Sequence, residues 1–146
     1  MKRKNLPTIV LFAATSNANR FNFRKDHDTT RVKDLETSVS FYGNILGLEQ
    51  ISNGGLGDHI KWFQLNNKVQ LHLFESEEMV EKNKGVHTAF NTDKLSEFMD
   101  FLRSQNIPFE NWKGEKDTIT NRPDGIKQIY FQDPDGYWIE VNDSKV

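Results

Sequence analysis

The chain has 146 residues and a net charge of −2, a size that suits one compact domain or two small fused modules. Apolar residues make up 36% and include 11 Phe, so a hydrophobic core can form, and no long basic run indicates nucleic-acid binding. The absence of cysteine excludes disulfides, zinc fingers and thiol nucleophiles.

The first twenty residues allow two interpretations. Lys2-Arg3-Lys4 precedes an apolar run from Leu6 to Ala14, and Ser16-Asn17-Ala18 resembles a cleavage site, so residues 1–18 have the layout of a secretory signal peptide. That interpretation implies a secreted or periplasmic protein. The alternative, which we favour, is an N-terminal extension over residues 1–20 of a cytoplasmic protein. No apolar run reaches the roughly 18 to 20 residues that span a bilayer.

Residues 21–143 are expected to form a single domain made of two modules, residues 21–75 and 85–143. In the first module, Asp34 suits the N-cap of a helix over 35–45, whose apolar residues recur at helical spacing. Gly47 suits the position just after its end. The predicted strands of this module are residues 21–33, 48–52, 60–65 and 68–74, so its order is β-α-β-β-β.

The charged stretch Glu75–Lys84 is predicted to be a solvated linker. In the second module the apolar residues of a helix over 95–104 share one face, and residues 113–125 are expected to be a loop. Asp133-Pro134-Asp135-Gly136 is a turn, because Pro fixes φ early in a turn and Gly permits a positive φ late in one. The predicted strands are residues 85–91, 107–112, 126–132 and 137–142, again in the order β-α-β-β-β.

The repeated position of histidine in the two modules indicates a metal site. His27 and His87 stand sixty residues apart, and each leads into the same pattern of a short β-rich stretch followed by an amphipathic run. Each module closes on a strand with a polar residue that could bind a metal, Gln70 in the first and Glu140 in the second. A duplicated unit can thus bring one imidazole and one side-chain oxygen from each half to a pseudo-twofold axis. The alternative is that each of these residues, taken separately, is an ordinary hydrogen-bonded polar residue.

Strand alternation places Glu140 on one face with Trp138 and Asn142, and a carboxylate buried there costs several kcal/mol unless a cation accompanies it. The match of residues 69–71 with 139–141 makes Gln70 the counterpart of Glu140. His72 is the rival ligand, one pleat further along the same face, because imidazole is a better donor than an amide to Zn, Ni or Fe.

These motifs resemble the vicinal oxygen chelate superfamily, which includes glyoxalase I, methylmalonyl-CoA epimerase, extradiol dioxygenases, fosfomycin-inactivating thiol transferases and bleomycin-resistance proteins. The matching stretches are residues 27–35, 38–42, 46–48 and 85–87, together with Tyr130-Phe131-Gln132-Asp133-Pro134-Asp135-Gly136-Tyr137-Trp138-Ile139-Glu140. The resemblance covers residues 21 to 143, and the Asp-Pro-Asp-Gly ending is its most specific part.

The resemblance implies an α+β fold of two tandem βαβββ modules whose sheets curl around a U-shaped cleft, often formed across a homodimer with swapped parts. It also implies one divalent ion (Ni, Zn, Mn, Co or Fe) held by His27, His87, Glu140 and Gln70 or His72. Glyoxalase I generally carries a carboxylate where Gln70 stands, and an amide cannot take a proton near neutral pH. Glu140 is then the only one of these ligands able to act as base.

Three functions fit this pattern. The first is a glyoxalase-type lyase or isomerase that stabilises an enediolate of a small oxygen-chelating substrate. The second is an Fe(II) extradiol dioxygenase, although no extra histidine stands near the end of the chain to act as acid or base. The third is a bleomycin-resistance-type protein that binds a small molecule without turnover. The candidate substrate-binding residues are Trp62, Tyr130, Trp138 and Arg122; core packing is the alternative for the aromatic residues, and a solvated loop for Arg122.

Overall fold

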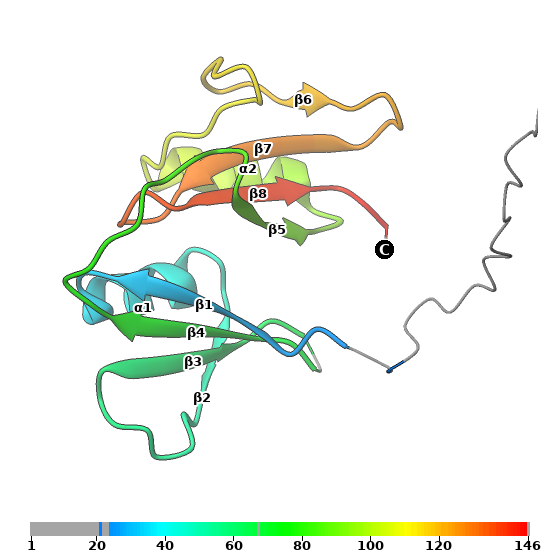
Figure 1. Ribbon diagram of the computed structural model, residues 1–146. Coiled ribbons are helices and arrows are strands. Elements are labelled where there is room, and N and C mark those ends of the chain that lie inside the picture. The colour runs from blue at the N-terminus through cyan, green and yellow to red at the C-terminus, as the bar shows by residue number, and fades with distance from the viewer. Residues whose placement is uncertain (1–20, 22–23, 67, 146) are drawn as a thin grey trace, which may run out of the picture.

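The computed structural model describes residues 21, 24–66 and 68–145, so both interpretations of residues 1–20 lie outside the described part. Two modules, each with one helix and one four-stranded sheet, follow one another along the chain (Figure 1). The first contains β1 (His27–Val32), α1 (Leu35–Asn44), β2 (Glu49–Ile51), β3 (Ile60–Gln64) and β4 (Gln70–Glu75). The second contains β5 (His87–Asn91), α2 (Leu95–Ser104), β6 (Thr120–Asn121), β7 (Lys127–Gln132) and β8 (Trp138–Asn142). The predicted α+β fold of two βαβββ modules is confirmed.

The two sheets have the same topology. Their strand orders are β1-β4-β3-β2 and β5-β8-β7-β6, so β1 and β5 are the corresponding edge strands. Each edge strand runs parallel to the last strand of its own module, and the other pairs are antiparallel. Since the two histidines that the sequence singles out begin β1 and β5, they occupy equivalent places in the two sheets.

Local sequence accounts for both helices. The Asp34 side chain accepts a hydrogen bond from Thr37 N at 2.7 Å and so satisfies a free N–H group at the start of α1. Gly47, with φ of 66°, takes the left-handed conformation that lets the chain turn away after α1. The span of α2 is residues 95–104, as its apolar spacing predicts, although no side chain caps its start.

One hydrophobic core joins the modules. Buried residues from both sheets and both helices belong to it, among them Phe131 of β7. The Phe131 ring is 6.3 Å from the ring of Phe41 on α1 and 5.8 Å from that of Phe98 on α2. The apolar faces of the two sheets therefore face the helices and the junction, and the opposite faces remain for polar residues.

The turn between β7 and β8 attaches the second module to α1 and to the residue before its N-cap. Asp133 accepts a hydrogen bond from the Tyr42 hydroxyl at 2.8 Å, and Asp135 accepts one from Lys33 N at 3.2 Å. Gly136 has a φ of 85°, as the turn motif predicts. Burial raises the pKa of Asp133, while the hydrogen bond from Tyr42 lowers it. This turn is therefore a polar anchor within an otherwise apolar junction.

We expect Tyr42→Phe to lower the free energy of unfolding by about 1–3 kcal/mol at neutral pH, because it leaves a buried carboxylate with one donor fewer. The hydroxyl bonds the charged form of Asp133 more strongly than the neutral form. The loss should therefore be fully present above the pKa of Asp133 in the folded variant, which is higher than in the wild type, and should shrink as pH falls and Asp133 becomes protonated. Urea unfolding of both proteins over a pH series measures the difference. An equal loss at every pH would contradict this assignment.

Three predictions of local structure are wrong. Residues 107–112 form no strand and pair only through isolated bridges from Glu110 to Lys116 and to Tyr130, while β6 lies inside the stretch predicted to be a loop. The Asn111 side chain accepts a hydrogen bond from Glu115 N at 2.9 Å, so a local turn replaces strand pairing there. Lys84, at the end of the predicted solvated linker, has a side chain only 17% exposed.

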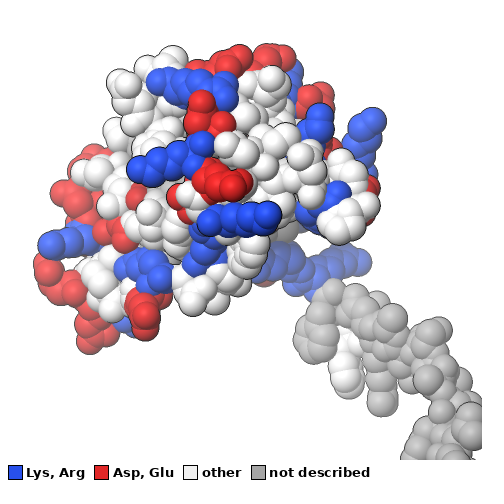
Figure 2. All heavy atoms as spheres, turned by 90° about the horizontal axis from the view of Figure 1, so that it is seen from above, with Lys and Arg blue, Asp and Glu red and all other residues white. Residues whose placement is uncertain are grey.

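Charges of both signs are interspersed over the face shown in Figure 2, without a wide patch of one sign. Among the described residues, no helix is long and apolar enough to cross a membrane.

Candidate metal centre

The polar faces of the two sheets carry the residues singled out by the sequence. In the first sheet, His27, Gln70 and His72 alternate with the buried residues Val32, Leu71 and Leu73, so they point to the side away from α1. In the second sheet the same alternation separates His87, Tyr130 and Glu140 from the core residues Ile129, Ile139 and Val141. Each module thus presents one histidine-bearing face.

Strand register corrects the internal match that makes Gln70 the counterpart of Glu140. His27 stands beside Gln70, and His87 stands beside Trp138, so Gln70 corresponds to Trp138. Two residues further on, His72 lies opposite Trp62 just as Glu140 lies opposite Tyr130. The equivalent sets are therefore His27, His72 and Trp62 in the first module, and His87, Glu140 and Tyr130 in the second. The error has a simple physical origin, because a shift of two residues keeps every side chain on the same face.

Glu140 is only 6% exposed and both of its carboxylate oxygens have partners. Oε1 accepts a hydrogen bond from Asn142 Nδ2 at 2.7 Å, and Oε2 accepts one from the Tyr130 hydroxyl at 2.8 Å. Burial raises the pKa of Tyr130, followed by its bond to Glu140, so this hydroxyl remains a donor at neutral pH. Gln128 in turn donates to the Tyr130 oxygen. The carboxylate is held in one orientation by β7 and β8.

His87 Nε2 lies 3.2 Å from Glu140 Oε2. The other ring nitrogen, Nδ1, lies 2.6 Å from the carbonyl oxygen of Lys84. A carbonyl can only accept, so Nδ1 carries a proton, and a neutral His87 then directs the lone pair of Nε2 toward the carboxylate. Two acceptors this close repel one another unless a proton or a metal ion lies between them. The pair is therefore a place for a cation.

The first module stacks three rings on its polar face. The His72 ring lies between those of Trp62 and His27, with centroid distances of 4.1 Å to each. His72 Nε2 also bonds Gln70 Oε1 at 2.9 Å, and burial, followed by the charge of His27, lowers the pKa of His72. The indole N–H of Trp62 is buried without a hydrogen-bond partner among the described residues. His27 is more accessible, with 40% of its side chain exposed.

The candidate ligands do not meet within the described part of the chain. It contains no group of three or more His, Asp or Glu side chains placed to hold a metal ion. His87 and Glu140 form one pair, and His27 and His72 form another on the other sheet.

Arg122 is ion-paired with Asp124 beyond β6, and it lines an open hollow of about 610 Å³ that also contains Asn142. A second hollow of about 500 Å³ shares a wall along β5 with the first and includes His87. The two hollows thus adjoin each other along β5, and the second one reaches His87.

The sequence analysis did not identify two polar residues near Glu140, Asn142 and Lys84, as functional candidates. Asn142 shares a face with Glu140, so strand alternation places it there, but nothing in the pattern shows that its amide donates to the carboxylate. Lys84 gives no such signal, because it belongs to a charged stretch that is otherwise mostly exposed. Its Nζ lies 4.6 Å from the centre of the Trp138 ring, which places Trp138 at the edge of this group.

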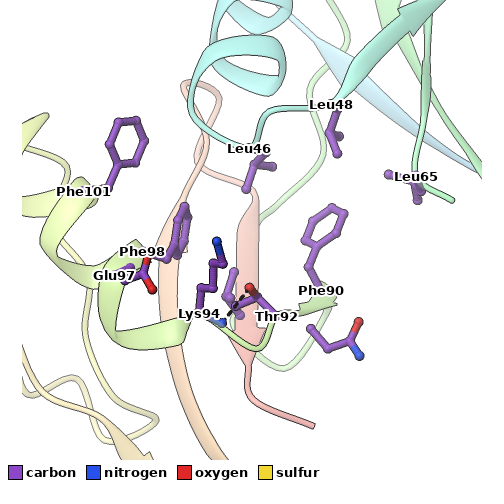
Figure 3. Close-up of a pocket in the computed structure, with 11 residues that line it drawn as sticks. Leu46, Leu48, Leu65, Phe90, Thr92, Lys94, Glu97, Phe98 and Phe101 are labelled. Carbon is purple, nitrogen blue, oxygen red and sulfur yellow. Dashed lines mark hydrogen bonds between the residues drawn. The ribbon is translucent and has the colours of Figure 1, made fainter. Parts of the chain in front are cut away.

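The apolar cavity between the modules is separate from the candidate ligands. It measures about 510 Å³, and Leu46, Leu48, Phe90, Phe98 and Phe101 contribute to its walls (Figure 3). All of these except Phe101 also pack against the shared core. None of the predicted ligands lines this cavity.

Comparisons with known proteins agree with this fold. The profile of the family described as the Glyoxalase/Bleomycin resistance protein/Dioxygenase superfamily matches residues 24–141. The metallothiol transferase FosB of Staphylococcus epidermidis is 27% identical over 123 residues, which cover 80% of this chain and 79% of that protein. The Bacillus subtilis protein YwbC is 27% identical over 124 residues, which cover 80% of this chain and 94% of that protein.

Solved structures share the fold at lower sequence identity. The oxidase ChaP-H2 superposes with a TM-score of 0.69 at 21% identity, covering 84% of this chain and 94% of that one. The fosfomycin resistance protein FosX of Listeria monocytogenes superposes with a TM-score of 0.67 at 23% identity, covering 85% and 95%.

Proposed function

Because the chain belongs to the Glyoxalase/Bleomycin resistance protein/Dioxygenase superfamily, we propose that it is a metal-dependent enzyme acting on a small oxygen-rich substrate. One divalent ion, Ni, Zn, Mn, Co or Fe, binds to His87 and Glu140, and His27 completes the set. The reaction is of the lyase or isomerase type, in which a proton leaves the carbon next to a carbonyl group.

The observation that carries this proposal is the contact between His87 Nε2 and Glu140 Oε2. Their separation of 3.2 Å matches two atoms that bind one ion with bonds of about 2.1 Å. The proton on Nδ1 leaves Nε2 free to bind a metal, and the carbonyl that accepts this proton is a common outer partner of metal-binding histidines. The Tyr130 and Asn142 donors hold the carboxylate in the same way.

His27 reaches this ion from a second copy of the chain. The described part of one chain does not group three ligands, and His27 begins an edge strand with much of its side chain exposed. Val86, beside His87, is 79% exposed, and Trp112, whose ring centroid lies 5.5 Å from that of Tyr130, is 49% exposed. An apolar rim around half a metal site suits contact with another protein surface. A homodimer would hold two such sites.

The register of β4 favours His72 over Gln70 as a fourth ligand or proton acceptor. His72 stands where the second module has Glu140, and Gln70 Oε1 accepts a hydrogen bond from its Nε2. Its lowered pKa keeps the ring neutral at neutral pH, so it can take a proton. Both oxygens of Glu140 already accept hydrogen bonds, which suits holding the ion better than acting as base.

The bound ion would supply a Lewis acid that stabilises negative charge on two adjacent substrate oxygens. Trp62 offers its unpaired indole N–H to the substrate beside His72. Arg122 lines the hollow beside β5. Its guanidinium can bind an anionic group of the substrate when that group replaces Asp124 as its ion-pair partner. Tyr130 and Trp138 form the walls next to the metal.

Thiol transfer to an anionic small molecule is the second candidate. The similarity to FosB, a metallothiol transferase, extends over 80% of this chain, and the exposed Arg122 suits an anionic substrate. Extradiol dioxygenase chemistry and ligand binding without turnover are two further functions that the test below would detect at the same site.

The test is metal analysis followed by a substrate panel. We expect the wild-type protein to bind one divalent ion per chain, and His87→Ala to weaken binding by about 100-fold or more. Calorimetric titration of metal-free protein measures this. A hemithioacetal, a catechol, and a thiol with an electrophilic acceptor then separate the three chemistries. Full metal occupancy in His87→Ala would remove His87 from the site, and tight ligand binding without any turnover would favour a binding protein.

A further inference from the structure

Lys84 is the cation closest in sequence to His87, and the second module holds it firmly. Its Nζ donates to the Glu110 carboxylate, to Asn111 O at 3.2 Å and to Trp112 O at 3.4 Å. The side chains of Lys84 and Glu110 are only 17% and 23% exposed. A cation this enclosed requires such partners, so the contacts fix the end of the linker against the loop before β6.

The backbone of Lys84 holds the His87 ring in its orientation. Its carbonyl oxygen accepts the hydrogen bond from His87 Nδ1 at 2.6 Å. The carbonyl and the anchored ammonium belong to the same residue, so the position of one depends on the contacts of the other. Without that acceptor, an imidazole in water favours neither this orientation nor this tautomer strongly enough to direct Nε2 at Glu140.

The Lys84 ammonium also faces the rings next to the carboxylate. Nζ lies 4.6 Å from the centre of the Trp138 ring and 5.7 Å from that of Tyr130, distances at which a cation is attracted to an aromatic ring. Glu110, its ion-pair partner, exchanges two backbone hydrogen bonds of 2.8 Å with Tyr130. The Tyr130 hydroxyl is the donor to Glu140 Oε2. Lys84 therefore supports both halves of the His87–Glu140 pair.

We propose that Lys84 is a positioning residue, which holds the His87 ring with Nδ1–H donated to its own carbonyl and Nε2 directed at Glu140 before any metal binds. The consequence for metal affinity rests on the proposed function. The ring orientation itself does not, because it belongs to the metal-free protein.

The experiment compares Lys84→Met, which keeps an apolar stem, with Lys84→Arg, which keeps the charge. Lys82→Met is the matched control, because Lys82 lies in the same linker and its Nζ is 4.5 Å from the centre of the Tyr137 ring. Nitrogen-15 NMR of metal-free protein reports whether Nδ1 of each ring carries a proton and whether that proton is protected from exchange with water. The signals of His87 are assigned by their loss in His87→Ala.

In the wild type, Lys84→Arg and Lys82→Met we expect His87 Nδ1–H to be protected from exchange by its bond to Lys84 O. In Lys84→Met this protection should be lost, and zinc affinity should fall about 10-fold. If Lys84→Met does not fold, Glu110→Gln gives the same test by weakening the anchor and keeping Lys84.

Unchanged protection of His87 Nδ1–H in folded Lys84→Met and in Glu110→Gln would overturn the proposal. A wild type that protects Nδ1–H but binds no metal would instead contradict the proposed function and leave the positioning role standing.

Discussion

Glu140→Gln should abolish tight metal binding, with affinity reduced by at least about 100-fold and turnover lost with it. The substitution keeps the shape of the side chain and removes the negative charge that faces His87 Nε2 at 3.2 Å. An amide is a much weaker partner for a divalent ion than a carboxylate, and its NH₂ group also competes with the donors from Tyr130 and Asn142. Titration of metal-free protein with zinc measures the affinity.

Asp143→Asn is the control for Glu140→Gln, because it removes a carboxylate three residues further along the chain. Asp143 Oδ1 accepts a hydrogen bond from Lys127 N at 2.8 Å and has no contact with His87. We expect Asp143→Asn to bind metal as the wild type does. Thermal unfolding of both variants without metal checks that each is folded. Wild-type affinity in Glu140→Gln would show that the pair with His87 is a structural contact and not a metal site.

A mixed dimer of His27→Ala and Glu140→Gln chains should regain metal that neither variant binds alone. If each site takes His27 from one chain and His87 with Glu140 from the other, the mixed dimer contains one intact site and one doubly defective site. Two different affinity tags isolate the mixed dimer after co-expression. It should then hold about half of the metal of the wild-type dimer, because two symmetric sites become one.

The matched control for the mixed dimer pairs His87→Ala with Glu140→Gln. Both substitutions lie in the second module, so each site in that dimer lacks one of its ligands and no metal is regained. Failure of the first mixed dimer to bind metal, while the wild type binds it, would place His27 on the same chain as its partners or outside the site. A protein that remains monomeric at micromolar concentration would contradict the shared site directly.

The sequence predicts the elements well where local chemistry decides them. The helix beginning after Asp34 and the turn at Asp133-Pro134-Asp135-Gly136 follow from capping and turn preferences. Periodicity places both helices within a residue of their observed ends. The strand predicted at 107–112 fails because isolated bridges and a side-chain turn around Asn111 take the place of regular pairing. Local preference cannot show which backbone groups find a partner in another strand.

By itself, the sequence determined that the chain is duplicated, that each half is a βαβββ module, and that His27 and His87 open equivalent strands. These features follow from periodicity and from the repeat. Only the tertiary structure decided that His72, and not Gln70, matches Glu140, since alternation is unchanged by a shift of two residues and hydrogen-bonded register is not. It also placed the Lys84 ammonium against Glu110 and beside the rings of Tyr130 and Trp138, because contacts between distant segments depend on how the whole chain packs.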